Sequence, residues 1–115
     1  DKLIYINHEL FAMIEASVSI DLLTRLLSTQ LLARGEKHLL DRSRFYFRLL
    51  RQIVRQGTQR GEFREGLTQD EIVRAFAMWE RAQLYDWCLC SGDYSLVTYA
   101  DKMTPLFLES FRANI

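Results

Sequence analysis

Apolar residues recur at steps of three and four along most of the chain, which is the spacing that places them on one face of a helix. In residues 2–15 this face consists of Leu3, Ile6, Leu10, Met13 and Ile14. A second helix is predicted from about Ile20 to Gly35, and a third and longer one from about Lys37 to Arg60. No stretch alternates with the period of two that a half-buried strand shows. The pattern therefore predicts an all-α fold.

A capping box marks the start of the fourth helix at residues 68–71, which read TQDE. The Thr68 hydroxyl can accept a hydrogen bond from the Glu71 amide, and the Glu71 carboxylate can accept one from the Thr68 amide. This helix is expected to run to about residue 91. Ser95 then caps a last helix that reaches almost to Ile115. The prediction is five helices.

The fourth helix has apolar residues on three stripes, although a surface helix needs only one stripe of about 100°. The last helix is similarly apolar. Five helices cannot fully surround two of their own members, so we expect the last two helices to form a four-helix interface with a second copy. The predicted dimer interface consists of Ala75, Met78, Ala82, Tyr85, Leu89, Tyr99, Met103 and Leu106. The alternative is that one of these helices is the central core helix of a monomer.

Length and composition are those of a single globular domain over residues 1–115, with 49% hydrophobic and 26% charged residues. Cys88 and Cys90 would point about 200° apart on a helix and cannot bond to each other. They are expected to be unpaired core thiols, which favours a reducing compartment. With no membrane-length apolar run and no signal peptide, we expect a cytoplasmic protein without a membrane partner.

The net charge is zero, but residues 34–64 hold nine Lys/Arg against three Asp/Glu. Zero overall charge gives no general attraction to nucleic acid. An arginine stripe at positions 44, 48, 51 and 55 could hold an anion or contact nucleic acid, and the favoured interpretation is a solvated helix face.

The chain shows none of the residue patterns that catalysis requires. It has no Ser/His/Asp or Cys/His arrangement and no glycine-rich phosphate loop. His8 and His38 lack partners at metal-ligand spacing. We therefore expect no enzyme activity, no catalytic residues, no metal and no cofactor.

Three short motifs follow one another, GTQRGEFR at 57–64, ERAQLYDW at 80–87 and GDYSL at 92–96. In this order and spacing they resemble the C-terminal domain of TetR-type transcriptional regulators over residues 45–112. Ala82 stands where relatives commonly have glycine, a change that keeps the position small. The resemblance implies a five-helix domain that senses an effector and dimerises through its last two helices, in a DNA-binding regulator that acts as a repressor.

In such regulators a small molecule enters the helical domain and changes the spacing of two DNA-binding heads. The helix-turn-helix head normally precedes this domain, and no such segment is present in the 115 residues. DNA is therefore expected to be bound only through that missing N-terminal domain. The alternative function is a helical dimerisation or interaction module with no small-molecule ligand.

The resemblance also implies an effector pocket between the first, third and fourth helices. The candidate ligand-binding residues are Phe11, Ile14, Tyr46, Phe47, Leu50, Phe76, Trp79 and Glu80. The alternative for each is ordinary core packing. Glu80, Arg81 and Gln83 lie within an apolar helix and need partners, such as an arginine of the third helix, a group across the dimer or a ligand, and a partner inside the protein is the favoured interpretation. A cationic ligand anchored by Glu80 is one hypothesis.

Overall fold

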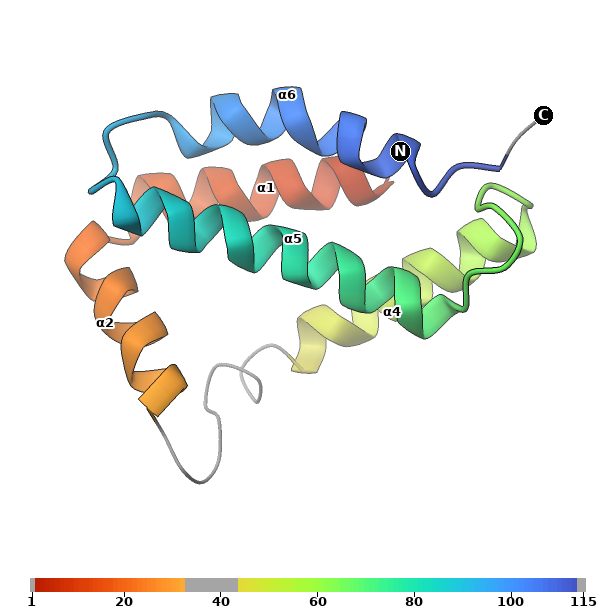
Figure 1. The fold of residues 1–115 in the computed structure, drawn as a ribbon, viewed down its shortest axis with the longest axis horizontal. Coiled ribbons are helices and arrows are strands. Elements are labelled where there is room, and N and C mark those ends of the chain that lie inside the picture. The colour runs from red at the N-terminus through yellow and green to blue at the C-terminus, as the bar shows by residue number, and fades with distance from the viewer. Residues whose placement is uncertain (1, 33–43, 114–115) are drawn as a thin grey trace.

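The computed structural model describes residues 2–32 and 44–113. In these ranges the chain forms α1 (Lys2–Ser17), α2 (Ile20–Leu32), α4 (Arg44–Gln59), α5 (Gln69–Leu89) and α6 (Leu96–Glu109), as Figure 1 shows. No strand is present within the described ranges, where the only extended pairing is an isolated bridge between Phe63 and Arg112. Over the described residues the chain is thus all-helical with five helices, as predicted.

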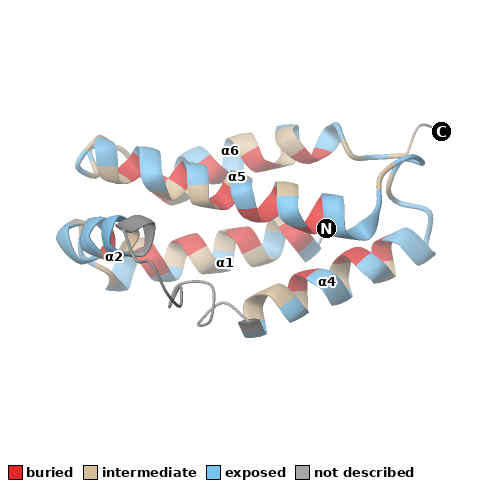
Figure 2. Ribbon diagram, turned by 60° about the horizontal axis from the view of Figure 1, so that its bottom comes forward, coloured by how far each residue is buried: buried red, intermediate tan, exposed pale blue. Residues whose placement is uncertain are grey.

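The helices lie in two layers. α5 and α6 form one layer, and α1, α2 and α4 form the other (Figure 2). α1 packs along α6, and α4 packs along α5. The molecule measures 44 × 33 × 19 Å, and the shortest dimension is about two helix diameters. Both layers therefore have one face towards the other layer and one face towards the outside.

The interior consists of two clusters of buried apolar side chains, and α1 contributes to both. The first cluster contains Leu3, Leu50, Val54, Ile72, Val73, Phe76, Ala77 and Leu108. The second contains Phe11, Ile14, Leu23, Trp87, Leu96 and Ala100. Full burial of one large apolar side chain stabilises a fold by about 1.5–3 kcal/mol, so these clusters are the main source of stability.

The predicted helix starts are confirmed in atomic detail. The Glu71 amide donates to Thr68 Oγ1 over 3.1 Å, and the Thr68 amide donates to Glu71 Oε1 over 2.8 Å. Ser95 caps α6 by accepting from the amide of Thr98 over 3.2 Å. α5 ends at Leu89, within two residues of the predicted end.

The last helix is shorter than predicted, since α6 ends at Glu109 and not close to Ile115. After that point the backbone pairs with the turn that follows α4. The Arg64 amide donates to the carbonyl of Phe111 over 2.8 Å, and the Ala113 amide donates to that of Glu62 over 3.0 Å. These bonds between segments take the place of the final helical turn, and periodicity within one segment does not reveal them.

Other expectations have mixed outcomes. The predicted helix boundaries at Gly35 and Lys37, and also His38, lie outside the described residues.

Three members of the arginine stripe, at 48, 51 and 55, are exposed, as the solvated-face interpretation requires. Cys88 and Cys90 form no disulfide with each other, as predicted, and both are half-buried. Cys88 packs against the second core cluster, as a core thiol does, whereas Cys90 follows the last residue of α5 and belongs to neither cluster, so the prediction of a core thiol is wrong for Cys90. No helix in the described ranges is both long and apolar enough to cross a bilayer.

Candidate functional site

A glutamate is buried between the two layers. The side chain of Glu80 is only 3% exposed and projects from α5 towards α1 and α4. The Asn7 amide Nδ2 donates to Oε2 of Glu80 over 2.9 Å, and the Tyr46 hydroxyl donates to Oε1. Both partners are neutral. The expectation that Glu80 finds its partner inside the protein is correct, but the partner from α4 is a tyrosine and not an arginine.

The hydrogen bonds continue from Asn7 into α6. The Thr104 hydroxyl donates to Oδ1 of Asn7 over 3.0 Å and accepts from Nε1 of Trp79 over 3.1 Å. Nε2 of Gln83 also approaches Oγ1 of Thr104, at 3.5 Å. A single polar network therefore connects α1, α4, α5 and α6 through the interior. Buried networks of this kind fix one packing arrangement, because each misplaced member leaves an unpaired polar group.

Burial dominates the electrostatics of the network. It raises the pKa of Glu80 to about 7, although the hydrogen bonds from Tyr46 and Asn7 and the charge of Arg81 act in the opposite direction. Burial, together with the neighbouring Glu80 charge, also raises the pKa of Tyr46. Glu80 therefore changes its protonation state close to neutral pH, while the Tyr46 phenol stays protonated.

Hydrogen-bond geometry decides where the proton of neutral Glu80 lies. Oε2 accepts from Nδ2 of Asn7, and the amide of Asn7 cannot be reversed without losing the bond that Thr104 donates to its oxygen. The proton therefore belongs on Oε1, where the Tyr46 oxygen can accept it once the hydroxyl hydrogen rotates away.

Gln83 adds an acceptor without a partner. Its side chain is 5% exposed, and Oε1 has no hydrogen-bond partner among the described residues. A buried carbonyl in this state costs about 1–3 kcal/mol. Gln83 follows Glu80 by three residues, so both lie on the inner face of α5. This face can therefore accept hydrogen bonds from a ligand that carries donor groups.

The structure distributes the eight candidate ligand-binding residues over two regions. Phe11 and Ile14 belong to the second core cluster, whereas Tyr46, Phe47, Leu50 and Phe76 lie in or against the first. Phe11, Leu50 and Phe76 are fully buried. Trp79 faces α6, where its ring stacks on Phe107 with centroids 4.6 Å apart and planes 4° apart. Only Tyr46 and Glu80 are joined directly by a hydrogen bond.

Asn7 and Thr104 were not expected in the site, whereas Gln83 was expected to need a partner. Both unexpected residues nevertheless left a detectable pattern, because they occupy apolar positions of a helical face. Asn7 follows Leu3 by four residues, and Thr104 lies midway between Ala100 and Leu108. A polar residue in such a place indicates a buried hydrogen bond.

The opposite, outer face of the α5–α6 layer is apolar. The exposed fractions are 51% for Met78, 51% for Tyr85, 66% for Leu89, 45% for Tyr99 and 59% for Leu106. Ala82 is also exposed, and Ala75 and Met103 are half-buried. The eight predicted interface residues therefore include six that remain exposed in the single chain. α5 thus has apolar residues on both faces, and the polar Glu80 and Gln83 lie among the buried apolar residues of its inner face, whereas an ordinary surface helix has a single apolar face.

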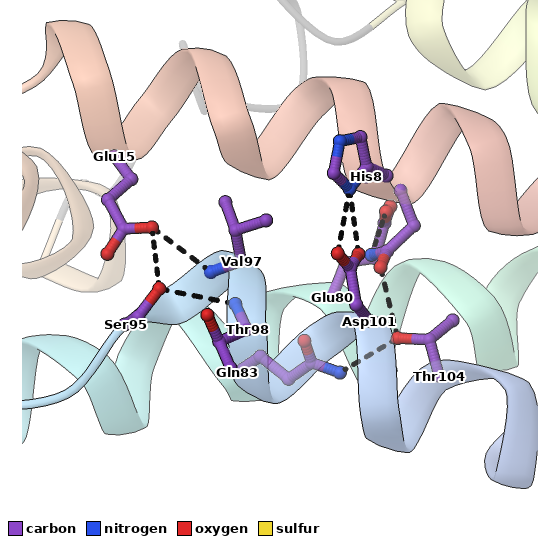
Figure 3. Close-up of polar contacts among 10 residues, drawn as sticks. His8, Glu15, Glu80, Gln83, Ser95, Val97, Thr98, Asp101 and Thr104 are labelled. Carbon is purple, nitrogen blue, oxygen red and sulfur yellow. Dashed lines mark hydrogen bonds and ion pairs between the residues drawn. The ribbon is translucent and has the colours of Figure 1, made fainter.

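A histidine bridges α1 and α6 near the network. Nδ1 of His8 lies 2.8 Å from Oδ1 and 3.0 Å from Oδ2 of Asp101 (Figure 3). The hydrogen bond to Asp101 and the charge of that carboxylate raise the pKa of His8. Among the described residues, no group of three or more His, Cys, Asp or Glu side chains could hold a metal ion.

Comparison with known proteins identifies no relative of this chain. No family model, curated protein or solved structure matches it. The buried network and the outer face of α5 and α6 are therefore the features on which a function can be assigned.

Proposed function

We propose that this chain is the effector-sensing and dimerisation domain of a TetR-like transcriptional regulator that acts as a repressor. DNA binding would belong to a helix-turn-helix outside these 115 residues. The observation that carries the proposal is the apolar outer face of α5 and α6, defined by Met78, Tyr85, Leu89, Tyr99 and Leu106.

The spacing of this face supports a second copy as its partner. On α5 the positions 75, 78, 82, 85 and 89 advance by alternating steps of three and four, the repeat of helices that pack side by side. Small Ala75 and Ala82 alternate with large Met78 and Tyr85, so large side chains of one protomer can fill the space beside the alanines of the other. Because α6 extends the same face, two copies related by a two-fold axis would form a four-helix interface.

The position of Glu80 supports a sensing role. Its side chain lies on the inner face of the helix whose outer face would form the dimer, and it is bonded to α1 and α4. A ligand that replaced the bonds to Asn7 or Tyr46 would therefore change how α5 sits on the other layer. We propose a small molecule with a cationic or hydrogen-bond-donating group, because within the described part of the chain Glu80 has only neutral hydrogen-bond partners and Gln83 Oε1 has none.

The dimer is tested by sedimentation equilibrium. The wild type should be a dimer, and Leu89→Glu or Tyr85→Arg should raise the dimer dissociation constant at least about a hundredfold, because a charge would be buried against apolar side chains. Leu22→Glu is the matched control. Leu22 is 59% exposed on α2, which belongs to the other layer (Figure 2), so this variant should remain dimeric. A monomeric wild type would contradict the proposal.

Effector sensing is tested separately, by the change in melting temperature of the dimer with a panel of aromatic monocations. A cation that stabilises the wild type should lose most of its effect with Glu80→Gln. A stable dimer that no member of the panel stabilises would favour the second candidate, a helical dimerisation module without a small-molecule ligand.

A further inference from the structure

A pocket lies at the end of the bundle where the N-terminus of α1, the turn after α4 and the segment after α6 meet. Its volume is about 680 Å³, within the range of small-molecule sites. None of its lining residues belongs to the Glu80 network or to the outer face of α5 and α6. It therefore requires an explanation of its own.

One wall of this pocket depends on the close approach of an aromatic ring to a glycine. A Cβ atom added to Gly57 would lie 2.6 Å from Cε2 of Phe63, so only glycine allows the ring to pack this closely on α4. Gly61 then reverses the chain with φ of +72°, a conformation that favours glycine. The motif at residues 57–64 thus holds Phe63 and the neighbouring Arg60 at the pocket.

The lining combines an apolar floor with a basic rim. Leu3 and Leu108 are almost completely buried, and Ile53 and Phe63 are partly buried beside them. The charged side chains of the lining are Lys2, Arg60, Glu62 and Arg112. Among the described residues of the lining, three cations and one carboxylate leave two net positive charges, in a chain whose overall charge is zero.

The three cations have weak or neutral partners. Nζ of Lys2 donates to the amide oxygen of Gln56 over 3.1 Å. Nη1 of Arg60 lies 3.9 Å from Oε2 of Glu62, and both side chains are more than half exposed. Arg112 pairs with Glu109, which is outside the pocket lining, and that pair is also exposed. Because exposed pairs hold their charges weakly, a ligand anion can compete for both arginines.

We propose that this pocket binds a small amphipathic anion, with a carboxylate, sulfonate or phosphate head and a short apolar body. The apolar body would lie on Leu3, Leu108 and Phe63. The head would accept hydrogen bonds from Arg60 and Arg112, whose planar guanidinium groups match such anions. This site does not depend on the proposed regulatory function.

Octanoate is the probe, and its titration is followed by the amide NMR shifts of the full 115-residue chain. Octylammonium, which has the same tail and the opposite charge, is the matched ligand. Octanoate at millimolar concentration should shift the amides of residues 60–63 and 112–113 and bind at least about tenfold more tightly than octylammonium.

Two variants test the basic rim. Arg60→Gln and Arg112→Gln should each weaken octanoate binding about tenfold, while Arg48→Gln, an exposed arginine of α4 outside the pocket, should leave it unchanged. The proposal is overturned if octanoate leaves these amides unshifted, if octylammonium binds equally well, or if neither pocket variant weakens binding. Shifts confined to α5 and α6 would also overturn it, because they would locate binding at the apolar outer face.

Discussion

Nδ2 of Asn7 donates a hydrogen bond to Oε2 of Glu80 over 2.9 Å, between residues that are 1% and 3% exposed. This contact joins α1 to α5 inside the protein, and both hydrogen-bond partners of the carboxylate, Asn7 and Tyr46, are neutral. A buried carboxylate in such surroundings favours its neutral form. The stability of the fold should therefore depend on pH close to neutrality.

Glu80→Gln should make the protein more stable than the wild type above pH 7. The pKa of Glu80 rises from an ordinary 4.5 to about 7 in the folded state, so the folded protein keeps this proton to higher pH than the unfolded chain. The contribution of Glu80 to the stability of the fold is fully present below pH 4.5 and is lost as the pH rises through 7. Glutamine keeps the hydrogen bonds of the neutral Glu80 carboxyl group, because its Oε1 can accept from Asn7 while its Nε2 donates to the Tyr46 oxygen.

Above pH 7 the free energy of unfolding of Glu80→Gln should exceed that of the wild type by at most about 3 kcal/mol, the equivalent of the pKa difference. It is measured as the free energy of unfolding in urea over a pH series at constant protein concentration. Glu65→Gln, a change at an exposed glutamate, is the control and should follow the wild type at every pH. If the difference between Glu80→Gln and the wild type did not change with pH, Glu80 would not titrate as described.

Thr104→Val should destabilise the fold by about 2–4 kcal/mol. The substitution keeps the shape of a side chain that is fully buried, but it removes the donor to Asn7 and the acceptor for Trp79. Each unpaired polar group left behind costs about 1–3 kcal/mol. Thr104→Ser keeps the hydroxyl and loses only a methyl group, at about 1 kcal/mol. The measurement is the free energy of unfolding of the two variants in urea. Equal values for Thr104→Val and Thr104→Ser would show that the hydroxyl group does not stabilise the fold.

The His8–Asp101 contact predicts a second pH effect with the same direction. The pKa of His8 is raised above 6.5, so the stability that the bridge supplies is fully present below pH 6.5 and is lost as the pH rises through the folded-state value. Asp101→Asn should return the pKa of His8 towards 6.5, as an NMR titration of the imidazole protons would show. Asp93→Asn, a change at an exposed aspartate on the loop before α6, should leave it raised. A wild-type value at or below 6.5 would refute the bridge.

The sequence by itself determined the helices and their starts. Apolar spacing and short-range hydrogen bonds define them, and both depend on residues within one or two turns, as at Thr68 and Glu71. The same spacing showed that α5 is apolar on more sides than five helices can cover, and the exposed Met78, Tyr85 and Leu89 agree with this.

Only the tertiary structure decided which partners meet. Asn7 and Glu80 are 73 positions apart in the chain, and Asn7 and Thr104 are 97 apart. The backbone pairing that ends α6 early likewise joins residues 62–64 to residues 111–113. Such contacts depend on how helices are placed in space, and a periodicity within one helix carries no information about that placement. The burial of Glu80 beside neutral partners, and with it a pKa of about 7, follows from the packing of α1 and α4 against α5.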